Sequence, residues 1–194
     1  MLRDILIDKN KQEIKQHGNI KFPFRIGYED IWQYYNGKFA GHWHKEIEFT
    51  YVYQGRMKYQ VNDKIYELKK GQCLFINIHF LASEEELIYK KYILPIIYSK
   101  NLASFVCLPE NKLEKKIIKQ VKYIDKCYKR QSLFYELEIK EHLLKLGQLL
   151  WQLFKDEIEN NMDKNYYRQL TKIKQMIEFI HKHYAEKNNF KRYS

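Results

Sequence analysis

The sequence is poor in cysteine and has no long apolar run, and both absences limit the class of protein. Three cysteines, Cys73, Cys107 and Cys127, occur in 194 residues without CxxC spacing. This odd number argues against a disulfide framework and against a cysteine-rich zinc site. No apolar run approaches the roughly 20 residues of a membrane-spanning helix, and residues 1–10 lack the apolar core and cleavage site of a signal peptide. We therefore expect a soluble cytoplasmic protein without a membrane partner.

The sequence motifs of nucleophilic and nucleotide-dependent catalysis are also missing. There is no Gly-x-Ser-x-Gly, no P-loop and no Gly-rich dinucleotide turn. The cysteines have no partner histidine nearby in the sequence, and burial as small hydrophobic residues accounts for them. We expect a protein that is not an enzyme.

The chain has a formal charge of +11, from 35 basic and 24 acidic residues. Residues 111–194 carry +8 of this excess and residues 1–110 carry +3. A basic balance of this size is typical of nucleic-acid-binding proteins. The chain is, however, rich in Lys, Ile, Asn and Tyr together, as AT-rich codons produce without selection for phosphate contacts. We therefore favour solvated lysines on helix surfaces over a nucleic-acid surface.

Residues 46–77 alternate between side chains of two kinds, as β-strands do. In the first strand an apolar and aromatic face opposes a polar one, with Ile47, Phe49, Tyr51 and Tyr53 opposite Glu46, Glu48 and Thr50. Turn signals separate four predicted strands, Glu46–Tyr53, Arg56–Val61, Lys64–Leu68 and Cys73–Asn77. Short strands at this spacing predict an antiparallel sandwich or a small barrel.

From Pro109 onward the apolar residues recur with a helical period. They form three stripes: Leu113, Ile117, Val121, Ile124 and Tyr128; Leu143, Leu146, Leu150 and Leu153; and Leu170, Ile173, Ile177, Ile180 and Tyr184. Stripes of this length are compatible both with packing inside one chain and with packing that also forms a dimer. Between the second and third stripes, Lys155–Lys164 is either a linker or a frayed helix end.

The stretch Gly41–Glu48 holds the residues best suited to bind a metal ion or a polar ligand. If strand geometry begins by His42, a period of two places His42, His44, Glu46 and Glu48 on one face. Imidazoles two residues apart on a strand can meet one metal ion or one polar ligand, and a carboxylate can join them. Histidines that are merely hydrogen-bonded in the wall of a barrel are the alternative. Trp43 falls on the opposite face, where we expect it to pack against the sheet.

The spacing of His42, His44, Glu48 and Gly55 fits the first cupin motif. Over about residues 15–85 the chain resembles the sensor domain of AraC-type transcription regulators, on the series Phe22-Pro23-Phe24, His42–Glu48, Tyr51-Val52, Gly55, Tyr66-Glu67-Leu68 and Gly71. This resemblance implies an α+β fold with a small antiparallel β-barrel of the cupin-like, jelly-roll type. An α-helical dimerisation region and the first helix of a truncated helix-turn-helix domain follow the barrel.

The resemblance also implies a domain order along the chain. Residues 1–108 correspond to an effector-binding barrel with an N-terminal arm, and residues 109–156 to the dimerisation region, with helices at about 111–130 and 133–155. Residues 157–194 correspond to a linker and the truncated start of a DNA-binding domain, whose first helix is Tyr167–Glu186. The eight residues after Glu186 are too few for a recognition helix.

We therefore expect the effector-sensing and dimerisation part of an AraC-like transcriptional regulator. A small-molecule effector is expected to contact His42, His44, Glu48 and Tyr59. A homodimer is expected to form through Leu143, Leu146, Leu150 and Leu153. DNA is expected to be bound only through the missing C-terminal domain or through a full-length partner.

The second cupin motif departs from the family pattern. Ile76-Asn77 and Ser83 are present, but Ala82 stands where the family has a histidine, and His79 lies three residues too early unless the strand bulges. We therefore expect neither a bound metal nor another cofactor. The alternative is a metal-dependent cupin enzyme, an isomerase or dioxygenase, in which His42, His44 and Glu48 form an open three-ligand site.

Overall fold

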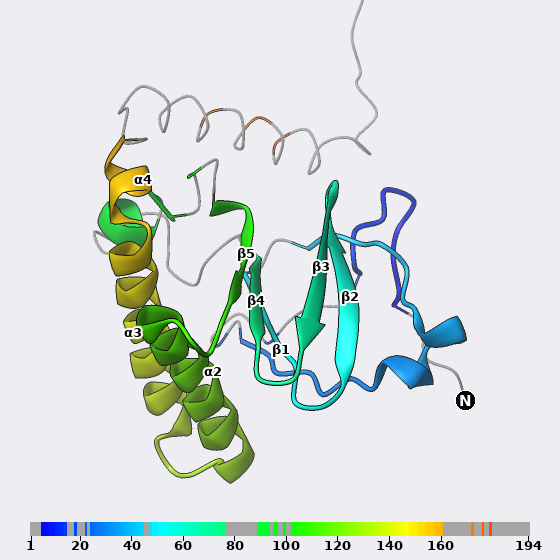
Figure 1. Ribbon diagram of the computed structural model, residues 1–194, viewed down its shortest axis with the longest axis horizontal. Helices are drawn as coiled ribbons and strands as arrows, with labels where there is room; N and C mark the ends of the chain where they lie inside the picture. The colour runs from blue at the N-terminus through cyan, green and yellow to red at the C-terminus, as the bar shows by residue number, and fades with distance from the viewer. Residues whose placement is uncertain are drawn as a thin grey trace, which may run out of the picture.

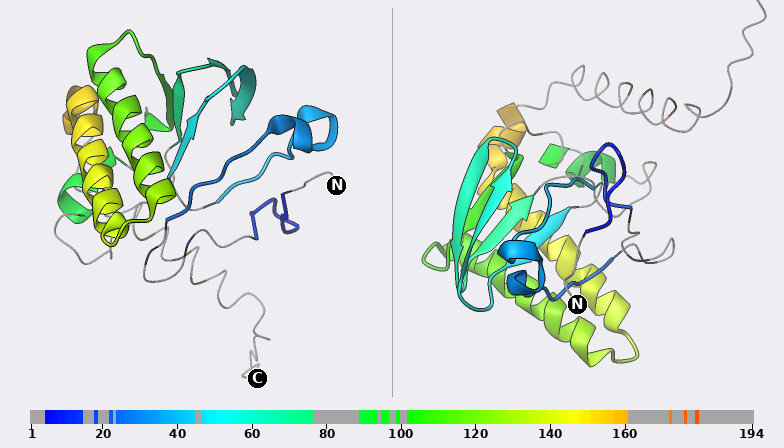
Figure 2. Two further views of the ribbon diagram at one scale, coloured as in Figure 1. Left: turned by 90° about the horizontal axis from the view of Figure 1, so that it is seen from below. Right: turned by 90° about the vertical axis from the view of Figure 1, so that its right-hand side faces the viewer.

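The computed structural model describes residues 5–14, 24–44, 47–76, 89–93 and 102–160, and the single residues 18, 22, 95, 96, 99, 172, 176 and 179. Its strands are β1 (Glu48–Tyr51), β2 (Arg56–Val61), β3 (Lys64–Lys69), β4 (Cys73–Ile76) and β5 (Ser104–Cys107). Its helices are α2 (Lys112–Arg130), α3 (Tyr135–Leu153) and α4 (Lys155–Asn160), with short helical turns η1 (Ile31–Gln33), η2 (Tyr35–Gly37) and η3 (Tyr89–Ile93). Helices α2 and α3 lie side by side against β1, β4 and β5, and the β2–β3 hairpin lies on the other side (Figures 1 and 2).

The strands form two antiparallel sheets. The larger sheet has the order β1-β4-β5, and β2 and β3 pair with each other. The four predicted strands are all present, and Arg56–Val61 agrees to the residue. The prediction of an α+β fold with antiparallel sheets is therefore confirmed. The five strands in the described part of the chain lie in separate sheets of three and two strands, and they do not by themselves close the predicted barrel.

Strand β4 is buried along its whole length because it is covered on both sides. Cys73 and Phe75 belong to the apolar cluster that the helices cover, whereas Leu74 and Ile76 belong to a second cluster under the β2–β3 hairpin. The pleat sends alternate side chains to opposite faces. A strand covered on both sides needs apolar residues at every position, which explains why this strand is a continuous apolar run in the sequence.

Helix α2 begins and ends with recognisable caps. The Asn111 side chain accepts hydrogen bonds from the backbone N–H groups of Leu113 and Glu114, and Gln131 ends the helix in the left-handed conformation with φ of 47°. Helix α4 occupies the first part of Lys155–Lys164, so this part is not a linker. No helix within the described ranges is long and apolar enough to cross a membrane.

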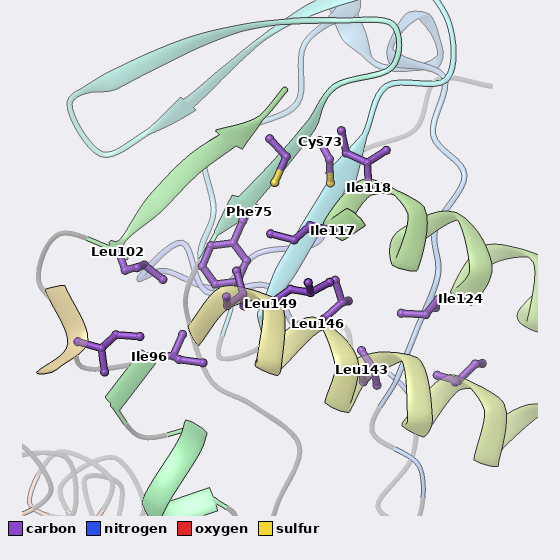
Figure 3. Packing of buried hydrophobic residues seen from close by; sticks show 14 of the residues in the cluster. Cys73, Phe75, Ile96, Leu102, Ile117, Ile118, Ile124, Leu143, Leu146 and Leu149 are labelled. Atoms are coloured by element: carbon purple, nitrogen blue, oxygen red, sulfur yellow. The ribbon is translucent and has the colours of Figure 1, made fainter. Parts of the chain in front are cut away.

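The leucines predicted to form a dimer lie in the core of the single chain. Leu143, Leu146 and Leu150 are buried and Leu153 is half-buried, all in the cluster that also contains Ile117 (Figure 3). The chain's own residues cover Leu143, Leu146 and Leu150, so these three leucines are core side chains. The predicted helix Tyr167–Glu186 lies outside the described residues, except for three positions with helical backbone, Lys172, Met176 and Phe179.

A buried carboxylate joins α2 to the strands. Asp125 is 8% exposed and accepts hydrogen bonds from the hydroxyls of Tyr28 and Tyr53 and, at 3.0 Å, from the Lys129 ammonium. Burial alone would raise the pKa of Asp125, but these hydrogen bonds hold it below its ordinary value. The same carboxylate raises the pKa of Tyr53 to about 12, so the phenol remains a donor. The ammonium also lies 4.7 Å and 5.3 Å from the ring centroids of Tyr28 and Tyr53.

The three cysteines are free and buried, which confirms the prediction that they act as small hydrophobic residues. Cys73 and Cys107 are partners across β4 and β5. Burial raises the pKa of the Cys107 thiol to about 12 and that of the Cys73 thiol well above its ordinary value. Both therefore stay protonated at neutral pH.

Substitution Leu146→Ala is expected to lower the free energy of unfolding by about 2–5 kcal/mol, because it leaves a cavity between the helices and the sheet. Leu6→Ala makes the same chemical change at a side chain that is 72% exposed, and we expect a change within about 0.5 kcal/mol. Urea denaturation followed by circular dichroism measures both. Equal losses in the two variants would contradict the assigned core.

Candidate functional site

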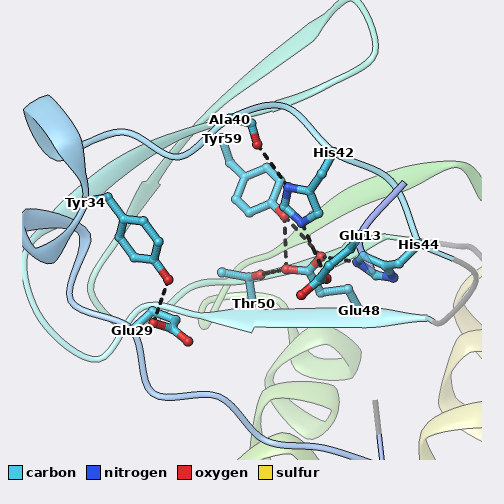
Figure 4. A network of polar contacts seen from close by, with 9 residues as sticks. All are labelled: Glu13, Glu29, Tyr34, Ala40, His42, His44, Glu48, Thr50 and Tyr59. Carbon is cyan, nitrogen blue, oxygen red and sulfur yellow. Dashed lines mark hydrogen bonds and ion pairs between the residues drawn. The ribbon is translucent and has the colours of Figure 1, made fainter. Parts of the chain in front are cut away.

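The four residues predicted to contact an effector lie in one polar cluster (Figure 4). His42 and His44 stand in the extended segment before β1, Glu48 is the first residue of β1, and Tyr59 lies on β2. The structure adds Thr50 and Glu13 to this cluster. Its members come from an N-terminal arm and from both sheets.

The Glu48 carboxylate is the centre of the cluster. It accepts hydrogen bonds from the Tyr59 hydroxyl at 3.0 Å and 3.1 Å, from the Thr50 hydroxyl, and from His44 Nε2 at 3.3 Å. Burial alone would raise the pKa of Glu48, but the hydrogen bonds from His44 and Thr50 and the His44 charge hold it below its ordinary value. Glu48 is therefore an ionised acceptor with several donors aimed at it.

The Tyr59 hydroxyl is held as a donor. Burial and the adjacent Glu48 carboxylate raise the pKa of Tyr59 far above its ordinary value, because phenolate would be both desolvated and next to a negative charge. The ring lies edge-on to Phe39, with centroids 6.3 Å apart. Phe39 also contacts Tyr34 and His42, at centroid distances of 5.4 Å and 6.0 Å. An aromatic wall therefore flanks the polar cluster.

The His42 ring is oriented by its own chain. Nδ1 lies 3.0 Å from the Ala40 carbonyl oxygen and donates a hydrogen bond to it. Nε2 is thereby turned toward the Glu13 carboxylate, 4.0 Å away. The His42 and His44 rings are 5.9 Å apart between centroids. Because His42 and His44 are two residues apart in an extended segment, their imidazoles lie together, as predicted.

The N-terminal arm lies against this cluster through backbone hydrogen bonds. Glu13 N donates to the Trp43 carbonyl oxygen at 2.9 Å, and Trp43 N donates to the Lys11 carbonyl oxygen at 3.0 Å. The Trp43 indole N–H also donates to the Asn10 carbonyl oxygen at 3.0 Å. Trp43 was expected to pack on the sheet, but its polar groups pair with the arm and its side chain remains partly exposed. The arm carries Glu13 into the cluster, and no sequence pattern near Glu13 indicates this.

The metal-binding alternative requires His42, His44 and Glu48 to converge on one point. His44 and Glu48 face each other at hydrogen-bond distance, and His42 faces Glu13 instead. Among the residues whose positions are described, no group of three His, Cys, Asp or Glu side chains is arranged to hold a metal ion. The second-motif positions His79 and Ala82 lie outside those residues. The described side chains of the polar cluster are therefore arranged in a way that fits hydrogen bonding to a polar molecule.

Substitution Glu48→Gln is expected to change how stability depends on pH. The folded pKa of Glu48 lies below its unfolded value, so its stabilising contribution is present at neutral pH and is lost as pH falls through the folded pKa. The wild-type and Glu48→Gln unfolding free energies should therefore differ most near pH 7 and converge below about pH 4. Urea titrations from pH 3 to 7 measure this. Glu67→Gln, at an exposed pair with Lys58, is the control and should change stability by less than about 1 kcal/mol at every pH.

Comparison with known proteins supports the resemblance of the sheet region to a cupin domain. Residues 34–79 match the family model of the cupin domain, and this range includes most of the polar cluster. The chain is 27% identical, over an aligned length of 210 positions, to the uncharacterized HTH-type transcriptional regulator YdeC of Bacillus subtilis (strain 168). That alignment covers 96% of this chain and 70% of the relative. No solved structure matches the chain. Residues 34–79 are therefore similar to a cupin domain, within a sequence that is distantly similar to a transcriptional regulator.

Proposed function

We propose that this chain is the effector-sensing and dimerisation part of an AraC-type transcriptional regulator. The observation that carries the proposal is the hydrogen-bonded cluster around Glu48, which places an ionised acceptor and phenolic, hydroxyl and imidazole groups beside an aromatic wall. Ligand sites of this kind combine a few convergent polar groups with aromatic walls. The similarity to an HTH-type regulator supports a regulatory use of the site.

The chemistry of the cluster indicates which effectors fit. Glu13 and Glu48 are acceptors, whereas Tyr59 and Thr50 offer hydroxyls that can turn from Glu48 to a ligand. Two carboxylates repel an anionic molecule and favour one that donates hydrogen bonds through hydroxyl or amino groups. We therefore assign effector contact to His42, His44, Glu48 and Tyr59, and add Glu13.

A regulator is favoured over the metal-dependent enzyme, the alternative function. The relative is a regulator, and a distinct helical region follows the cupin domain in this chain. In addition, His44 Nε2 and the Glu48 carboxylate already bond to each other. We therefore assign no catalytic step to the site, and a role in transcription places the protein in the cytoplasm.

The proposed division of the chain keeps residues 1–108 as the sensing unit, 109–156 as the dimerisation region and 157–194 as the start of the DNA-binding region. Because three of the four predicted leucines are buried, we place the homodimer contact on the outer face of α3 and the loop before it. This face exposes Leu133, Phe134, Leu137 and Leu144. Sequence-specific DNA contact is assigned to helix-turn-helix units and not to the sheets or to α2 and α3.

Effector binding is tested with a thermal-shift panel of monosaccharides, amino acids and amines. For a compound that raises Tm, Tyr59→Phe should weaken the affinity about 5- to 30-fold, as expected for one lost hydrogen bond. Tyr66→Phe is the matched control, because its hydroxyl bonds Ser104 and not Glu48, and its affinity should stay within twofold. Equal affinity in wild type and Tyr59→Phe would place the ligand elsewhere.

Dimerisation is tested by light scattering after size exclusion. We expect a mass of twice the 24.0 kDa chain and a monomer for Leu137→Lys combined with Leu144→Lys, because charge at an apolar interface is desolvated without a partner. Ile65→Lys, at a residue that is 65% exposed on β3, should remain dimeric. A wild-type monomer would refute the proposed contact.

A further inference from the structure

The outward face of α2 is almost entirely cationic. Nine of its residues are exposed, and eight of these are Lys or Arg: Lys112, Lys115, Lys116, Lys119, Lys122, Lys126, Lys129 and Arg130. Tyr123 is the ninth. At 100° per residue these positions fall within an arc of about 140°, along a helix about 27 Å long. Eight of the 19 basic residues in 111–194 therefore lie on one surface of α2.

The acidic residues of α2 do not neutralise this surface. Glu114 is half-buried and accepts a hydrogen bond from the Leu108 backbone N–H at 2.6 Å. Asp125 is buried under Tyr28 and Tyr53 and pairs only with Lys129 among the cations. Both carboxylates serve the inner side of the helix.

Most of the cations on this face have no ion-pair partner. Lys129 pairs with Asp125, and Arg130 pairs with Glu138. The other six form no ion pair with any residue in the described ranges. They are Lys112, Lys115, Lys116, Lys119, Lys122 and Lys126. Neighbouring ammonium groups on one helix face repel one another, so an anionic partner on this face would relieve that repulsion.

We propose that the outward face of α2 binds the phosphate backbone of duplex DNA without reading its sequence. The proposal rests on the proposed function, because a transcriptional regulator works next to DNA. One strand of B-DNA carries a phosphate about every 3.4 Å along the axis. A straight cationic row about 27 Å long can therefore lie beside several phosphates of one strand before the strand winds away from it.

The composition of the exposed face of α2 favours phosphate over base edges. Within Lys112–Arg130 the exposed residues are seven Lys, one Arg and Tyr123, with no exposed Asn, Gln, Ser or Thr. Such a face suits contact with the phosphate backbone, which positions a protein on the duplex and carries no sequence information. The contact would add affinity to a separate sequence-reading unit without changing its preference.

The same face does not fit insertion into a membrane. Interfacial helices present Leu, Phe or Trp to the lipid on an exposed apolar face, whereas the apolar side of α2 is buried in the core. Tyr123 stacks on His142, with ring centroids 5.3 Å apart and planes 9° apart, and lies under Lys119 and Lys126. Its ring is therefore already packed within the protein surface.

The test measures binding of the 194-residue chain to a fluorescein-labelled random-sequence duplex by anisotropy, at several NaCl concentrations. The α2 variant combines Lys112→Gln, Lys115→Gln, Lys119→Gln and Lys126→Gln. The matched control removes four positive charges from the β2–β3 hairpin by Arg56→Gln, Lys64→Gln, Lys69→Gln and Lys70→Gln, all at exposed residues. Replacing the same four α2 lysines by Arg keeps the charge and checks that the helix tolerates substitution.

We expect the wild-type log-affinity to fall with log salt concentration with a slope of about −3 to −5, at about 0.9 per phosphate contacted. The α2 variant should lose about 3 units of that slope and at least tenfold in affinity at 0.1 M NaCl. The hairpin and Arg variants should stay within threefold of wild type. Equal losses in the α2 and hairpin variants would show that only net charge matters and would overturn the proposal.

Two further outcomes would also overturn it. One is the absence of salt-dependent duplex binding by the wild-type chain. The other is binding to vesicles of phosphatidylglycerol and phosphatidylcholine that needs the α2 lysines while duplex binding does not. Because the assay contains no effector, it is independent of the Tyr59→Phe and Tyr66→Phe comparison. Failure here with an intact ligand response would remove only this inference, and the reverse result would remove only the sensing role.

Discussion

The alternation of side chains along β1 makes one short strand serve two environments. Glu48 and Thr50 turn toward the polar cluster, and Phe49 and Tyr51 turn toward the core under the helices. A shift of one residue would exchange these faces and bury the Glu48 carboxylate among apolar residues, where an unpaired charge costs several kcal/mol. The antiparallel register, in which Glu48 stands opposite Ile76, therefore fixes the core and the site together. Neither can be altered at this strand without disturbing the other.

Burial requires that a charged side chain of this molecule has hydrogen-bond partners. The half-buried Glu48 and the buried Asp125 each accept several hydrogen bonds, and both carboxylates have a lowered pKa for that reason. The lysines of α2 need no such partners because water solvates them. The interior thus holds anions that are fully engaged, whereas much of the positive charge is left on an outer surface. Composition alone gives the total charge but not this separation.

Local patterns predicted the strands and helices well because period two and period 3.6 are properties of neighbouring residues. They also placed His42, His44 and Glu48 together, since the three lie within seven residues of one extended segment. The patterns do not reveal Glu13, which reaches the cluster through backbone bonds between Trp43 and the arm. The patterns also do not say what covers an apolar stripe. Leu146 would fit the helical period equally well in a core or in a dimer interface, and the structure places it in the core.

The orientation of α2 about its axis depends on a residue that breaks the apolar pattern. Asp125 lies on the buried side of the helix, where an isolated carboxylate would be strongly unfavourable. It is tolerated because the Tyr28 and Tyr53 hydroxyls donate to it and the ammonium of the exposed Lys129 pairs with it. Those donors sit at fixed points on the strand side, so only one rotation of α2 satisfies them. That rotation turns the remaining lysines outward, and the surface charge of the helical region is therefore set by a contact in its interior.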